Sequence, residues 1–96
     1  MYLQSINGIA YDLFDKLAPD LIVELRTIPL DDMVLYHSTM GRHIRNEYGL
    51  WNTDHPLTKS WHTNLNRDVR NGVDYSTDHP DHISSRVMEL IWKMSQ

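Results

Sequence analysis

Apolar residues recur at helical spacing near both ends of the chain. In residues 2–17 the repeating positions are Leu3, Ile6, Ala10, Leu13, Phe14 and Leu17. In the last segment they are Ile83, Val87, Leu90, Ile91 and Met94. A spacing of i, i+3, i+4, i+7 is typical of a helix with one buried face. The sequence therefore predicts one helix over residues 2–17 and another that begins near Pro80.

A second, shorter helix is predicted directly after the first. Pro19 closes the first helix, because the residue before a proline is pushed away from helical geometry. Pro19 and Asp20 then suit the first turn of the next helix, whose apolar positions are Leu21, Ile22, Leu25 and Ile28. The triplet at residues 21–23 also suits a strand, but no partner strand is evident nearby, so a helix is favoured.

The central segment, from Leu30 to Gly49, predicts a single long helix. Asp31 and Asp32 suit the positive end of the helix dipole, and Gly49 suits the left-handed cap position. Gly41 lies beside the apolar face, which indicates close approach of a neighbouring helix or a ligand. That face consists of Met33, Tyr36, His37, Met40, Ile44 and Tyr48.

A four-residue echo, Thr-Asp-His-Pro, occurs at residues 53–56 and again at residues 77–80. A polar cap followed by proline is typical of a helix start, so each copy predicts one. After the first copy, Leu57, Trp61 and Leu65 would share a helical face. Between the copies, residues 66–76 are polar and contain Asn71-Gly72, a hairpin-turn signal. We expect a long loop there, with a small hairpin as an alternative.

These elements predict one all-α domain over residues 1–96, an irregular bundle of four to five helices. The chain has no cysteine and no apolar run long enough to span a membrane, so we expect a cytoplasmic protein, of a cell or of an infected host. The net charge of −4 disfavours nucleic acid as a partner, because phosphate contacts need a basic face.

The most chemically loaded stretch is the end of the predicted central helix. Arg42 and Arg45 are three residues apart, near the helix end that favours cations. Arg45 flanks the buried face, where it would be either a structural tie to Asp78 or Asp81 or a recognition group for an anion. Asn46 suits a local capping role or a binding role.

His37 and the tryptophans are expected to be mainly structural. His37 lies on the apolar face, where a histidine is usually a core side chain with one hydrogen bond, although it could also act as a general base or ligand. Trp51 is expected to fold back onto the helix end, and both Trp51 and Trp61 are expected in the core.

No motif of a metal site, a phosphate loop or an activated nucleophile is present. His79 and His82 are three residues apart, but zinc sites need three or four ligands in a fixed frame. We therefore expect no metal and no cofactor, and a non-catalytic role is favoured over an enzymatic one, which stays open as a third alternative.

Two motifs together resemble a known pattern. They are His37-x-x-Met40-Gly41-x-x-Ile44-Arg45-Asn46-x-Tyr48-Gly49-Leu50-Trp51 and His79-Pro80-Asp81-x-x-Ser84, followed by Trp92. They resemble a family of small uncharacterised helical domains, over about residues 30–94. Residues 66–76 are longer than that pattern. The resemblance implies no activity, but it implies that six side chains converge: His37, Arg45, Asn46, His79, Asp81 and Ser84.

Two non-catalytic functions remain open on this evidence. The first is a non-catalytic module that binds a protein through its Arg/Asn/His face or its polar insert; a phage-type inhibitor of a host protein is a special case, and a homodimer is an alternative partner. The second is a small anion- or nucleotide-binding domain that uses Arg42, Arg45, Asn46 and His79.

Overall fold

The computed structural model describes residues 3–65 and 67–96. Its α-helices are α1 (Ile6–Lys16), α2 (Pro19–Arg26), α3 (Arg42–Glu47), α4 (Lys59–His62) and α5 (Pro80–Ser95). A 3₁₀ helix, η1 (Leu30–Tyr36), and a π-helical turn, η2 (His37–Gly41), precede α3. Strands β1 (Val69–Arg70) and β2 (Val73–Asp74) pair antiparallel. The prediction of a small, mostly helical bundle is confirmed, and of the two alternatives for the loop between the Thr-Asp-His-Pro copies the structure has the small hairpin.

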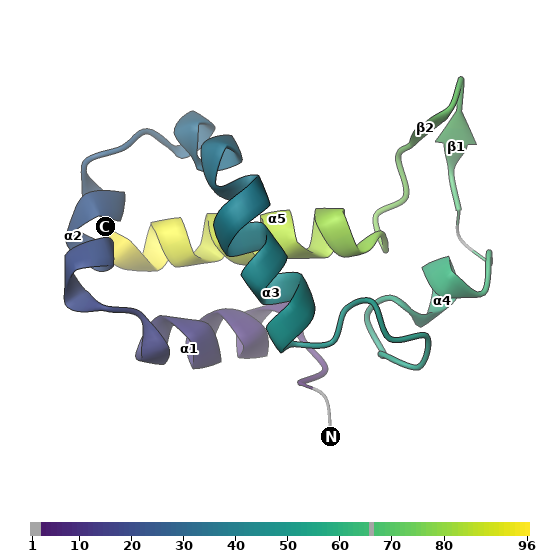
Figure 1. Cartoon of the computed structure of the whole chain (residues 1–96), viewed down its shortest axis with the longest axis horizontal. Helices are drawn as coiled ribbons and strands as arrows, with labels where there is room; N and C mark the ends of the chain where they lie inside the picture. Colours follow the sequence, from purple (N-terminus) through teal and green to yellow (C-terminus); the bar gives the residue numbers. More distant parts are fainter. Residues whose placement is uncertain (1–2, 66) are drawn as a thin grey trace.

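Helix α5 is the element against which the other long helices pack. Figure 1 shows α1 lying alongside α5 and α3 crossing it. Pro80 occupies the first turn of α5, as predicted. Of the predicted apolar stripe, Ile83, Val87 and Ile91 are buried, and Leu90 and Met94 are partly buried against the core. The fully or almost fully buried apolar side chains of the bundle include Ile9, Leu13, Ile44, Ile83, Val87 and Ile91. The predicted stripe of the last helix is therefore the centre of the core.

Helix α1 is shorter than predicted at its start. Tyr2 lies outside the described residues, and Leu3 precedes the helix with 40% of its surface exposed, so its expected place on the buried face is wrong. The helix begins instead after Ser5, whose Oγ accepts a hydrogen bond from the Gly8 N–H at 2.9 Å. A serine at this position satisfies one of the free N–H groups of the first turn, which fixes the start.

Helix α2 begins at Pro19 as predicted and lies beside the C-terminal end of α5 (Figure 1). The Arg26 Nε donates to the Ser95 carbonyl at 2.7 Å, and the Trp92 Nε1 donates to the Ile28 carbonyl at 2.9 Å. These bonds join residues that are 69 and 64 positions apart in the sequence. They tie the end of α2 and the residues just after it to the C-terminal part of α5.

The central segment is not the single α-helix that the sequence predicts. It runs as η1, then η2, then α3, with different hydrogen-bond spacing in each part. The predicted end is correct, since Gly49 has a φ of 67° and the Leu50 N–H donates to the Arg45 carbonyl at 2.9 Å. π-Helical turns inside helices are uncommon and frequently lie at functional sites, so the break directs attention to η2.

Residues 50–65 and 67–79 form a lobe at the end of the molecule opposite α2 (Figure 1). The prediction that residues 57, 61 and 65 share a helical face is wrong. Helix α4 has only four residues, and Asn64, with a φ of 65°, ends its turn and leaves Leu65 77% exposed. The hairpin turn is as predicted, with φ values of 52° at Asn71 and 79° at Gly72. The described helices include none with the length and apolarity that a membrane crossing requires.

Candidate functional site

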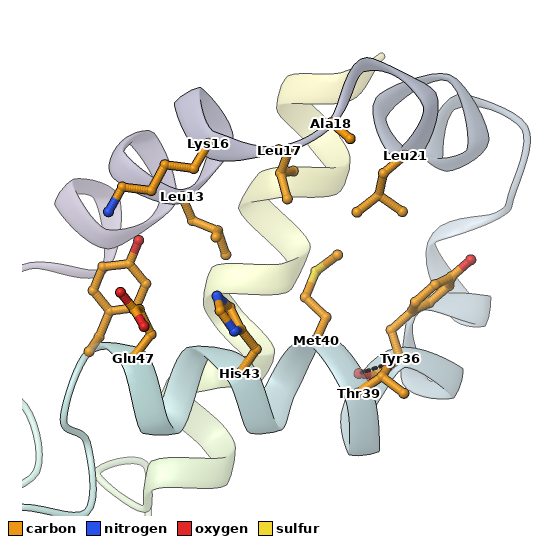
Figure 2. Close-up of a pocket in the computed structure, with 11 residues that line it drawn as sticks. Leu13, Lys16, Leu17, Ala18, Leu21, Tyr36, Thr39, Met40, His43 and Glu47 are labelled. Atoms are coloured by element: carbon orange, nitrogen blue, oxygen red, sulfur yellow. Dashed lines mark hydrogen bonds between the residues drawn. The ribbon is translucent and has the colours of Figure 1, made fainter.

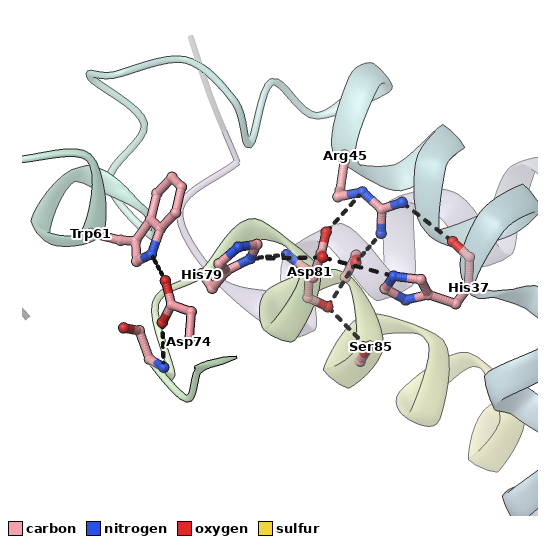
Figure 3. A network of polar contacts seen from close by, with 9 residues as sticks. His37, Arg45, Trp61, Asp74, His79, Asp81 and Ser85 are labelled. Atoms are coloured by element: carbon pink, nitrogen blue, oxygen red, sulfur yellow. Dashed lines mark hydrogen bonds and ion pairs between the residues drawn. The ribbon is translucent and has the colours of Figure 1, made fainter. Parts of the chain in front are cut away.

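Arg45 lies almost completely buried between α3 and α5, with 7% of its surface exposed. Its guanidinium has three protein partners (Figure 3): Nη1 donates to the Ser84 Oγ at 2.9 Å, Nη2 donates to the His37 carbonyl at 3.3 Å, and Nε lies 3.4 Å from the Asp81 Oδ1. Of the two carboxylates considered from the sequence, Asp81 is the ion-pair partner. Arg45 thus joins three segments of the chain.

Gly41 makes room for this guanidinium. A Cβ at position 41 would lie 2.9 Å from the Arg45 Nη1, which is closer than real Cβ contacts. The predicted cause of this glycine, a neighbouring helix or a ligand, is therefore wrong for the described residues. The group that approaches Gly41 is the side chain of Arg45, one turn further along the same helical run.

Asp81, the ion-pair partner of Arg45, lies in the first turn of α5, where a carboxylate also suits the positive end of the helix dipole. The His37 Nε2 lies 3.8 Å from the Asp81 Oδ2. The His79 Nδ1 lies 4.0 Å from the same oxygen, but it accepts a hydrogen bond from the Asp81 N–H at 2.9 Å. A nitrogen that accepts this bond carries no proton, so His79 caps the helix and does not form an ion pair with Asp81.

The same cap occurs at the first Thr-Asp-His-Pro copy. The His55 Nδ1 accepts a hydrogen bond from the Leu57 N–H at 3.0 Å, as His79 does from the N–H two residues further on. His55 is completely buried, and this burial lowers its pKa. In both copies the capping side chain is the histidine immediately before the proline. The echo therefore has a local structural meaning, although only the second copy opens a long helix.

Three of the remaining predicted site residues have different surroundings. Ser84 is completely buried and accepts from Arg45, while its Oγ donates to the Asp81 carbonyl at 3.0 Å. Arg42 and Asn46 are exposed on α3. The structure thus brings together His37, Arg45, His79, Asp81 and Ser84, and leaves Arg42 and Asn46 at the surface.

Trp61 organises the neighbouring lobe. Its Nε1 donates to the Asp74 Oδ2 at 2.8 Å, and its ring lies edge-on to His79 with the centroids 4.6 Å apart. Hydrogen bonds from Ser76 and Trp61 lower the pKa of Asp74 to about 2. The prediction that Trp51 lies in the core is wrong, since 47% of its surface is exposed. The Trp51 ring meets the Trp61 ring edge-on, with the centroids 6.2 Å apart.

A half-open apolar groove lies between α1 and α2 on one side and the η1–η2–α3 run on the other (Figure 2). It encloses about 630 Å³, and we call it the α1–α3 groove. In the figure, leucines from α1 and α2 face Met40 and His43 across it, with Lys16 and Glu47 at one end and Tyr36 at the other. Its apolar lining comes from Leu13, Leu17, Ala18, Leu21, Tyr36 and Met40.

Sequence reasoning assigned most of these apolar residues to the core and did not anticipate the groove. Leu13 and Met40 are indeed buried, but Leu17, Leu21 and Tyr36 are only partly covered. A helical stripe shows which face avoids water, and it does not show how far apart two packed helices diverge. No signal in the sequence marks this opening.

The groove ends carry polar groups with a net negative charge. At one end the Asp12 carboxylate accepts from the Tyr48 hydroxyl at 2.6 Å and pairs with the Lys16 Nζ at 2.9 Å. The Tyr48 hydrogen bond, followed by that of Lys16, lowers the pKa of Asp12, so this group stays ionised. At the other end the Tyr36 hydroxyl donates to the Glu24 Oε1 at 2.8 Å.

Among the described residues, no group of three or more histidine, aspartate or glutamate side chains has the arrangement to hold a metal ion. Comparisons of the chain with protein-family models, curated proteins and solved structures find no match. The resemblance to a family of small helical domains therefore stays a prediction.

Proposed function

We propose that this protein is a non-catalytic protein-interaction module and that the α1–α3 groove is its contact surface. The observation that carries the proposal is the groove itself: about 630 Å³ of half-open, mostly apolar space in a chain of 96 residues. Concave apolar surfaces of this size are typical binding sites. We propose the cytoplasm, of a cell or an infected host, as the compartment. A phage-type inhibitor of a host protein is one form of this function.

The alternative, an anion- or nucleotide-binding site at the arginines, has less support. Arg45 is almost completely buried and already contacts Asp81, Ser84 and the His37 carbonyl. A ligand anion would have to displace the Asp81 carboxylate, which already neutralises the guanidinium. Arg42 and Asn46 are accessible, but an exposed arginine without the buried one offers only a weak, salt-screened attraction.

Site-specific photo-crosslinking tests the proposal. The chain has no cysteine, so a Thr39→Cys variant carries a maleimide-linked photo-crosslinker at one position only. Thr39 is exposed and lines the groove, whereas Tyr11 is exposed on α1 and does not line it. In lysate of the source cell or host, we expect the label at position 39 to give one discrete protein adduct. The label at position 11 should give no such adduct.

An Ala18→Trp substitution in the labelled protein serves as the control with a blocked groove. Ala18 is exposed on the groove wall, and a tryptophan there would fill the space. Loss of the adduct in this variant supports a groove contact. A discrete adduct with an unlabelled copy of the chain itself would show a homodimer instead. Equal labelling from positions 39 and 11, with no effect of Ala18→Trp, would refute the groove as the contact surface.

A further inference from the structure

The chemistry of the α1–α3 groove is specific enough to define what fits it. This inference rests on the proposed function and names the class of partner. The floor of the groove is formed by buried side chains such as Leu13 and Met40, and its walls by partly covered side chains such as Leu17 and Leu21. The occupant must therefore present a continuous apolar surface to these side chains.

The length of the groove suits a helix. One wall is formed by a continuous helical run that includes Tyr36 near one end and Glu47 at the other. Eleven residue steps at about 1.5 Å each give a wall of roughly 16 Å. This is about three helical turns, enough for apolar anchors at positions i, i+4 and i+7 of a partner helix. A rounded small molecule would use only part of this length.

The charges at the two ends narrow the choice further. At the end that holds Lys16, its single positive charge is accompanied by two carboxylates, Asp12 at 2.9 Å and Glu47. The hydrogen bond to Asp12, and to a smaller extent the charge of Glu47, raise the pKa of the lysine. At the opposite end, Glu24 accepts the Tyr36 hydroxyl. The charge of Asp32 also acts on the Tyr36 hydroxyl. These groups therefore give both ends of the groove a net negative charge. An anionic amphiphile such as a fatty acid would meet this charge with its headgroup, which disfavours it.

We propose that the α1–α3 groove binds an amphipathic helix of a partner protein, with its apolar face on Leu13, Leu17 and Met40 and a basic residue at each end. The basic residues would lie beside Glu24 at one end and beside Glu47 and Asp12 at the other. The protein would thereby select helices by two features at once, an apolar stripe of about three turns and positively charged flanks.

Fluorescence anisotropy with model peptides tests this inference. The probe is a fluorescein-labelled peptide of about 14 residues, with leucines at i, i+4 and i+7 and lysines at both ends. One control peptide has the same composition with the leucines scrambled, and a second has glutamates in place of the lysines. We expect saturable binding of the probe and no saturable binding of the scrambled peptide. The glutamate peptide should bind about tenfold more weakly, because attraction at each end becomes repulsion.

Matched protein variants place the peptide in the groove. Ala18→Trp fills the groove and should abolish binding, whereas Val23→Trp adds the same side chain on α2 at an exposed position outside the groove and should not change it. Glu47→Lys should weaken binding of the lysine peptide and strengthen binding of the glutamate peptide. Circular dichroism verifies that each variant keeps its helical content.

The possible outcomes separate this inference from the proposed function. Equal affinity for the lysine and glutamate peptides, or for the ordered and scrambled peptides, overturns the partner class while a groove-dependent crosslink would keep the interaction function. Peptide binding that survives Ala18→Trp overturns the site. Laurate binding that Ala18→Trp abolishes, with neither peptide binding, would overturn both proposals and make the groove a small-molecule site.

Discussion

A Gly41→Ala substitution tests whether the Arg45 cluster is an internal fastener. The new Cβ would lie 2.9 Å from the Arg45 Nη1, so the guanidinium has to move away from Ser84. Loss of a buried hydrogen bond from a charged group costs about 1.5–3 kcal/mol. Alanine itself gains about 1 kcal/mol over glycine, because Gly41 has ordinary helical dihedrals, φ −59° and ψ −44°. The expected net result is a loss of about 1 kcal/mol of unfolding free energy.

The same substitution in an Arg45→Met background should have the opposite sign. Methionine keeps the apolar stem and lacks the Nη1 atom that the new Cβ meets, so only the helix-propensity gain of about 1 kcal/mol is left. The two backgrounds should therefore differ by about 2 kcal/mol, a coupling measurable by a double-mutant cycle. Urea denaturation followed by circular dichroism gives the four free energies. In thermal melts, 1 kcal/mol corresponds to about 4–8 °C for a domain of this size.

If Gly41→Ala stabilises the protein equally in both backgrounds, the guanidinium does not lie against Gly41 in solution. The reasoning about the fastener would then be refuted, and Arg45 would again be available as a recognition group. Gly8→Ala is the comparison within the chain. Its Cβ would also approach a polar atom, the Ser5 Oγ at 2.9 Å, but at an exposed helix cap far from the Arg45 cluster.

Three further predictions concern other polar groups. Burial lowers the pKa of His55 below its unfolded value, so as the pH falls the unfolded state binds a proton before the folded state does. The contribution of His55 to stability should therefore be complete above about pH 7 and fall as the pH drops below about 6.5. In urea titrations across pH, this fall should be smaller in His55→Asn, whose side chain keeps a hydrogen-bond acceptor. Because the folded pKa of Asp74 is about 2, its contribution to stability should be present above about pH 4 and disappear between about pH 4 and 2. Asp74→Asn should flatten this part of the curve of unfolding free energy against pH. An unchanged curve would contradict the hydrogen bonds from Trp61 and Ser76 to Asp74. Arg42→Glu should leave the midpoint of thermal unfolding within about 2–3 °C of the parent, since surface substitutions usually change stability by less than about 0.5 kcal/mol; a large drop would mean that this exposed arginine has a structural partner.

The sequence predicted those parts of the fold that depend on local patterns. The stripe of α5, the proline starts of α2 and α5, the Gly49 cap and the Asn71-Gly72 turn are each readable from a few neighbouring residues. In each case the physical cause is local: a missing N–H, a positive φ or a repeated apolar face. These features do not depend on which distant segment the element meets.

The predictions that failed have two causes: partners far away in sequence, and a local stop that apolar periodicity does not show. The predicted central helix divides into η1, η2 and α3. The side chain of Arg45 passes close to Gly41 and bonds to Ser84, which is 39 residues further along the chain. The stripe of Leu57, Trp61 and Leu65 is broken at Asn64, whose tolerance of left-handed dihedrals ends the turn. Periodicity alone gave no reason to prefer this local stop to continued helix.

Some features of the candidate site were likewise predictable from the sequence, and others were not. Residue chemistry indicated that Arg45 would need a carboxylate, and Asp81 is that carboxylate. It could not indicate that Arg42 and Asn46 lie at the surface while Arg45 is enclosed. The α1–α3 groove was not predictable at all, because it depends on how far helices diverge where α1 gives way to α2. The site that now carries the functional proposal is therefore one that only the three-dimensional arrangement provides.

The most direct test of this account compares two variants in the crosslinking assay with the label at position 39. We propose that the α1–α3 groove binds the partner and that the Arg45 cluster holds α3 and α5 together. We therefore expect Ala18→Trp to remove the partner adduct and Arg42→Glu to leave its yield unchanged. The opposite result, an adduct that survives Ala18→Trp and disappears in Arg42→Glu, would contradict the account and return the contact surface to the arginine face of α3.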